Sequence, residues 1–89
     1  MNADRRKLVA QCIEKINHVC AELEDVREDL DFLRDEEYDS YASYPENLQE
    51  SERAVACLDN SEKFGEIYDT FEDFIDEING YLNDLTEML

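Results

Sequence analysis

Few residues of this chain are of the types that perform catalysis. His18 is the single histidine, and Cys12, Cys20 and Cys57 are the three cysteines. They form no Ser/His/Asp or Cys/His arrangement at an interpretable spacing. On a helix, Cys12 and Cys20 lie about 12 Å apart at 1.5 Å per residue, too far to share a zinc ion. We therefore expect no catalytic residue, no metal and no cofactor.

Carboxylate pairs offer the one enzymatic alternative. All-α nucleotide pyrophosphatases hold Mg²⁺ between E-x-x-E and E-x-x-D pairs that face each other across a bundle. Three pairs here have that spacing: Glu22 with Asp25, Glu28 with Asp31, and Glu66 with Asp69. With 25 acids in 89 residues, such pairs arise repeatedly by chance. The sequence therefore favours a protein that is not an enzyme.

Charge is the strongest compositional signal. The formal net charge is −17, and it is unevenly distributed. Residues 1–21 hold four basic residues against two acids, whereas residues 22–39 hold ten acids against two basic residues. Such a field repels nucleic acid and anionic membranes and attracts basic protein surfaces. We expect a basic protein as partner, with no direct binding to nucleic acid or membrane.

Acids spaced along a rigid helical rod imitate a phosphate backbone and fit a basic groove. This hypothesis assigns the binding to twelve acids, with a solvated face that serves solubility as the alternative. They are Asp25, Glu28, Asp29, Asp31, Asp35, Glu36, Glu66, Asp69, Glu72, Asp73, Asp76 and Glu77.

The rare cations support an alternative function, the sequestration of a small anionic nucleotide signal. Its candidate residues are cations, tyrosines that can stack on a base, and polar residues beside a helix start. They are Arg5, Arg6, Lys7, Tyr38, Tyr41, Tyr44, Asn47, Gln49, Ser51 and Arg53. An antiparallel hairpin places the two basic groups at opposite ends, so one pocket containing both needs an oligomer. The ordinary structural alternative pairs Arg53 with Asp35 or Glu36 and sets Arg5–Lys7 beside Asp84 and Glu87.

The first half of the chain predicts one long helix. Eight apolar residues alternate in steps of three and four, which is the spacing of a coiled-coil seam. They are Val9, Cys12, Ile16, Val19, Leu23, Val26, Leu30 and Leu33. Leu8, Ile13 and Cys20 widen this stripe near its start, and Asn2 or Asp4 can cap it. We expect a helix over about residues 3–38.

The second half of the chain predicts a helix over about residues 45–88. Its apolar residues form three adjacent columns along the helix, whereas a coiled-coil seam has two. Phe64, Phe71, Ile78 and Leu85 recur every seven residues, flanked by a column that begins at Ile67 and another that begins at Tyr68. A three-column face needs two neighbouring helices, which a dimeric four-helix bundle supplies. The predicted oligomer interface comprises Phe64, Ile67, Phe71, Phe74, Ile78, Tyr81 and Leu85. Asp59–Ser61 offers a break, but the phase that continues through it favours one helix.

Residues 39–44 form the predicted turn. The residue before a proline avoids the helical region, so Tyr44 precedes a helix that starts at Pro45. Ser43 with Glu46 offers an alternative capping box. This accounts for Pro45 and Ser43 but not for Gln49 or Arg53.

The string EEYDSYASYPENLQESERAVACLDN resembles short acidic helical proteins of phages and prophages of Firmicutes-type bacteria. Their outline is a basic start, an acidic helix, a P-E-N-L-Q-x-S-E-R turn and a second helix. Residues 45–49 and 51–53 fit this turn as they stand, whereas YDTFEDFIDEINGYL is richer in aromatic residues than the family's repeat. The resemblance implies a mobile-element origin and, by analogy, antagonism of a host enzyme or defence system. A structural or assembly role is a third alternative.

The sequence predicts an all-α protein of one domain, residues 1–89. It is a long antiparallel helical hairpin that dimerises into a four-helix bundle. No apolar run follows the basic N-terminus as in a signal peptide, and no segment is apolar enough to cross a bilayer. The three unpaired cysteines fit a reducing compartment. We expect a protein of the bacterial cytoplasm.

Overall fold

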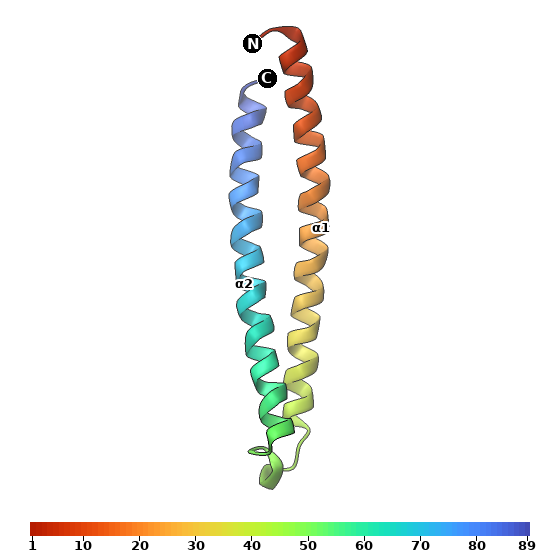
Figure 1. Ribbon diagram of the computed structural model, residues 1–89, viewed down its shortest axis with the longest axis vertical. Coiled ribbons are helices and arrows are strands. Elements are labelled where there is room, and N and C mark those ends of the chain that lie inside the picture. The colour runs from red at the N-terminus through yellow and green to blue at the C-terminus, as the bar shows by residue number, and fades with distance from the viewer.

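The computed structural model describes all residues from Met1 to Leu89 and consists of helices alone. Helix α1, Ala3–Ala42, and helix α2, Glu52–Glu87, lie side by side and antiparallel, joined by the short 3-10 helix η1, Glu46–Leu48 (Figure 1). Both termini lie at one end of the rod and the turn lies at the other. The molecule measures 70 × 15 × 14 Å. The predicted all-α hairpin is confirmed.

Helix α1 begins where the sequence predicts and ends later. The Asn2 side chain accepts a hydrogen bond from the backbone N–H of Arg5 at 2.8 Å, so Asn2 is the N-cap. Neither glycine nor proline interrupts the forty residues that follow. Ser43 ends the helix, and its hydroxyl donates to the carbonyl of Asp39 at 2.7 Å. Since that hydroxyl serves the end of α1, the predicted capping box of Ser43 and Glu46 does not form.

The connection is longer than the predicted turn because Pro45 starts η1 and not α2. Ser51 caps α2, and its hydroxyl accepts from the N–H of Ala54 at 3.3 Å. Gln49 donates its side-chain amide to the carbonyl of Tyr44 at 3.4 Å across the loop. Two polar residues of the P-E-N-L-Q-x-S-E-R stretch therefore have structural roles: Gln49 ties the loop and Ser51 starts the helix.

Helix α2 runs without a break through Asp59–Ser61, as the continuous apolar phase favours. Ser61 is itself buried against α1. The inner side of α2 alternates in steps of three and four from Ala54, which is 0% exposed, to the buried Ile75 and Leu82. It includes Phe64, Phe71, Ile78 and Leu85, which are half-buried. Four of the seven residues predicted for the oligomer interface thus lie along the side of α2 that packs on α1.

The seam predicted for α1 is half wrong. Val9, Ile16, Leu23 and Leu30 are half-buried as expected, but Cys12, Val19, Val26 and Leu33 are exposed. The second inner column of α1 is the one that includes Ile13, Cys20, Arg27 and Arg34. The physical reason is that α1, like α2, has three usable columns, and one partner helix covers only two.

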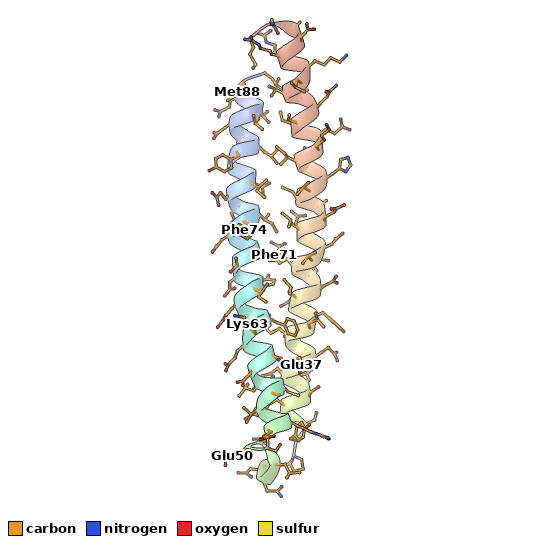
Figure 2. The ribbon with its side chains drawn as sticks, viewed as in Figure 1. Glu37, Glu50, Lys63, Phe71, Phe74 and Met88 are labelled. Carbon is orange, nitrogen blue, oxygen red and sulfur yellow. The ribbon has the colours of Figure 1, made fainter.

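The inner side of α1 becomes polar toward the turn. Arg34 reaches over the ring of Tyr68 at 5.4 Å from its centroid and forms ion pairs with Asp31 and Asp35. Glu37 also lies on the side toward α2 (Figure 2). Cation–π contact and ion pairing allow arginine to occupy a half-buried position in a seam.

Candidate binding surfaces

Two surfaces of the hairpin are not explained by the packing of α1 on α2. One is a dense run of carboxylates, and the other is a pair of exposed apolar columns. The structure contains no pocket, and no group of three or more His, Cys, Asp or Glu side chains is placed to hold a metal ion. Within a single chain, the E-x-x-D pairs of α1 and α2 do not gather into such a group.

The register of the two helices brings their acids to one stretch of the rod. An ideal Cβ on Gly65 would lie 3.3 Å from Cδ of Arg34, so these two residues lie level. Because antiparallel helices rise equally per residue, residues 22–39 of α1 lie beside residues 60–77 of α2. We call this stretch the acidic segment. It contains all twelve acids predicted to bind a partner.

The acidic segment carries charge at nearly the density of duplex DNA. Residues 22–39 hold ten acids against two basic residues, and residues 60–77 hold seven acids against one. The resulting net fourteen negative charges are spread over about 27 Å of rod at 1.5 Å per residue. That is one charge per about 2 Å, compared with about 1.7 Å in duplex DNA.

These carboxylates are accessible and mostly free of cations. Eleven of the twelve predicted acids are exposed, and Asp31 is half-buried. The ion pairs of the chain are those of Arg34 with Asp31 and Asp35, and of Lys63 with Glu66 at 3.5 Å. Surface pairs of this kind contribute little to stability. Most of the acidic segment therefore keeps an uncompensated field.

The second surface is apolar, and we call it the lateral face. It comprises the third column of each helix: Cys12, Val19, Val26 and Leu33 on α1, and Ile67, Phe74, Tyr81 and Met88 on α2. All are exposed except the half-buried Ile67. Phe71 lies between the two helices in Figure 2, whereas Phe74, 51% exposed, lies outside that space.

Both columns of the lateral face lie on the same side of the hairpin. On each helix this column precedes an inner column by one residue, as Val26 precedes Arg27 and Phe74 precedes Ile75. In an antiparallel pair of helices, the residues that precede an inner column by one position lie on the same side of the pair, whichever helix they belong to. The register also sets Val26 level with Phe74, and Val19 level with Tyr81. The opposite side has polar residues such as Asn17, Glu24, Asp31, Glu72 and Asn79 at the corresponding positions.

Sequence reasoning found the α2 half of this face and missed the α1 half. Phe74 and Tyr81 were predicted for the oligomer interface, but Cys12, Val19, Val26 and Leu33 were assigned to the seam within the hairpin. The missed signal is the column of Ile13 and Cys20, which already gave α1 a third apolar column.

The cations proposed for anion binding do not meet in one chain. Arg5, Arg6 and Lys7 are exposed at the end that holds the termini, and Arg53 is exposed at the turn end of a rod 70 Å long. None of the four forms an ion pair, so the expected pairing of Arg53 with Asp35 or Glu36 is wrong. Asp35 pairs with Arg34 instead.

The tyrosines and amides of the loop form a surface without a cleft. The rings of Tyr38 and Tyr41 lie 6.1 Å apart at 51°, and Tyr44 is half-buried. Asn47 is exposed, while Gln49 and Ser51 are engaged by the backbone bonds described above. Nothing encloses a ligand between these side chains.

The thiols and the histidine lie apart from one another. Cys12 is exposed, Cys20 is buried, Cys57 is half-buried and His18 is exposed. Burial raises the pKa of the Cys57 thiol, and the hydrogen bond and negative charge of Glu37 raise that pKa further. A raised pKa keeps this thiol protonated and lowers its reactivity.

No helix in the structure combines the length and the apolar character needed to cross a membrane. Comparison with protein-family models, with curated proteins and with solved structures found no match for this chain.

Proposed function

We propose that this chain is a non-catalytic binding protein that associates with itself and presents its acidic segment to a basic protein. The observation that carries the proposal is the charge density of that segment, close to one negative charge per 2 Å over about 27 Å. A groove shaped for a nucleic-acid backbone offers basic side chains at a matching density.

Rigidity adds to this match. The acids project from two paired helices rather than from a disordered tail, so they do not need to be ordered on binding. Electrostatic attraction then accelerates association and depends strongly on salt. The resemblance to phage and prophage proteins suggests a partner in a bacterial host, such as a nuclease, polymerase, repressor or defence factor. Occupation of its groove inhibits it by excluding nucleic acid.

The test is affinity capture from a host lysate with two variants of equal charge. The first variant carries Glu72→Gln, Asp73→Asn and Asp76→Asn in the acidic segment. The second carries Asp4→Asn, Glu14→Gln and Glu87→Gln near the termini, outside that segment. The wild type and the second variant should retain a basic protein that duplex DNA displaces, whereas the first variant should lose it.

Salt provides the second arm of this test. Charge–charge association weakens as ionic strength rises, because the Debye length is about 8 Å at physiological salt. Capture that survives high salt, or that the first variant retains, would contradict the proposal. Sequestration of a nucleotide predicts the opposite pattern, in which Arg53→Ala abolishes binding and the acid variants have no effect.

A further inference from the structure

The hairpin exposes more surface than a folded chain of its mass normally does. A compact monomer of 10.5 kDa exposes about 5,400 Å². This chain exposes 6738 Å². The excess of exposed surface is about 1,300 Å². For comparison, each partner in a stable interface buries about 800 Å² of its surface. Six of the thirteen large apolar side chains that this surface exposes belong to the lateral face, which spans both helices.

A second copy of this chain fits the lateral face because the face is self-complementary in length and composition. Its four levels each hold one residue from α1 and one from α2, such as Val26 with Phe74. A two-fold axis parallel to the rod places α1 of one copy against α2 of the other. These two helices are antiparallel, and their register is the same as that of α1 and α2 within one hairpin. Both turns then lie at one end of a four-helix bundle.

Charged residues at the edges of the lateral face select this orientation. Lys15 lies beside the α1 column, and Lys63 lies beside the α2 column. With the turns together, Lys15 lies level with the partner's Asp84 and Glu36 lies level with the partner's Lys63, and symmetry repeats each pair. Between these two pairs along the rod, Glu22 lies level with the partner's Glu77, so one pair of residues has like charges.

The opposite orientation, with turns at opposite ends, is less complementary. Its two-fold axis is perpendicular to the rod, and each helix packs on its own copy. Lys15 then meets the partner's Asp29, but Lys63 lies beyond the partner's last residue. In the single chain Lys63 pairs only with the exposed Glu66, at 3.5 Å, so it is free to turn toward a partner.

We propose that two copies of this chain pack through their lateral faces with both turns at the same end. This deepens the proposed function, because it names the partner of the lateral face and leaves most of the acidic segment outside. Asp29, Glu36 and Glu77 border the interface, and the other nine predicted acids point to the back or the polar side of each hairpin. In this dimer the Arg5–Lys7 groups meet at one end and remain far from Arg53.

The first experiment measures the mass of the protein in solution by sedimentation equilibrium. The wild type should be a dimer. Phe74→Glu should raise the dimer dissociation constant by at least ~100-fold, since it places a charge in an apolar interface. Phe32→Glu is the matched control, because Phe32 is 63% exposed but lies on the outer side of α1, and it should leave the dimer intact.

The second experiment tests orientation with a short bis-maleimide that links cysteine thiols. With the turns together, the two Cys12 thiols lie about 10 Å apart across the axis, because neighbouring helix axes are 8–10 Å apart. With the turns apart they are separated by about 30 Å, at 1.5 Å per residue. Covalent dimers should form in the wild type and disappear in Cys12→Ser.

Charge reversal keeps the proposal testable if Phe74→Glu unfolds the chain. Lys15→Glu should weaken the dimer by ~10-fold through its two symmetric pairs, and adding Asp84→Lys should restore it. A monomeric wild type, equal effects of Phe74→Glu and Phe32→Glu, or a dimer without Cys12 links would overturn the proposal. A monomeric wild type would also remove self-association from the proposed function, whereas binding of a basic protein by the acidic segment is tested separately by capture.

Discussion

The two glycines of α2 differ in their surroundings, and this difference predicts opposite responses to alanine. Apart from the backbone of its own helix and its chain neighbours, no atom lies within 4 Å of where a Cβ on Gly80 would be, so Gly80→Ala meets open space. Alanine is about 1 kcal/mol more favourable than glycine inside a helix. For a domain of this size, that gain raises Tm by about 4–8 °C.

Gly65 has less room. A Cβ there would lie 3.3 Å from Cδ of Arg34, whose guanidinium stacks on Tyr68 and pairs with Asp31 and Asp35. These contacts hold Arg34 in place, so the added methyl must displace it. Gly65→Ala should therefore gain much less than Gly80→Ala, or destabilise the hairpin.

Urea unfolding followed by circular dichroism measures both variants, alone and with Arg34→Ala. In the Arg34→Ala background the two alanine substitutions should give equal gains, because the crowding is gone. Equal gains already in the wild type would refute the contact between Arg34 and Gly65, and with it the register that aligns the two halves of the acidic segment.

The other predictions concern the packing, the caps and the thiols. Ile75→Ala should lower the free energy of unfolding by about 2–5 kcal/mol, because Ile75 is 3% exposed and its removal leaves a cavity; a loss below about 1 kcal/mol would contradict its placement in the seam. Asn2→Ala and Ser51→Ala should each cost about 1 kcal/mol in thermal unfolding, because each removes a helix cap; unchanged midpoints would show that the caps do not form. Cys57 should react with iodoacetamide more slowly in the folded chain than in the urea-unfolded chain just below pH 9.0, since its pKa in the folded chain is raised above that ordinary value, and the two rates should converge only at higher pH. Equal rates below pH 9.0 would contradict the burial of this thiol beside Glu37.

The sequence predicted the fold because its apolar period is nearly uninterrupted. A period of three and four over most of the chain indicates long helices, and a single proline marks the one reversal. The sequence also predicted that α2 continues without a break through Ser61, because the small residues of that stretch keep the three-and-four spacing where the two helices lie close together. The start of α2 was missed because Pro45 precedes the 3-10 helix as its N-cap residue and does not begin α2.

The side of α1 that packs on α2 could not be read from periodicity. Val26 and Leu33 are more apolar than Arg27 and Arg34, so composition favours the wrong column. Arg34 lies on the inner side because α2 offers Tyr68 and the glycine at position 65 at its level, and this pairing depends on register. Register follows from the length of the connection, which the sequence predicted too short.

The sequence hypothesis names twelve of the seventeen acids in the acidic segment, but it does not predict the charge density of that segment. The two acid-rich stretches are separated by twenty residues in the chain, and only the register shows that they lie level. The same register aligns the two columns of the lateral face. One geometric fact therefore supports both surfaces.

The most direct test of the account is native mass spectrometry of the protein isolated from its natural host. We predict assemblies built on two chains of 10.5 kDa, with any additional mass that of a basic protein. A small mass in the nucleotide range would contradict it and assign the function to the cations, while a single chain at all concentrations would contradict the role of the lateral face.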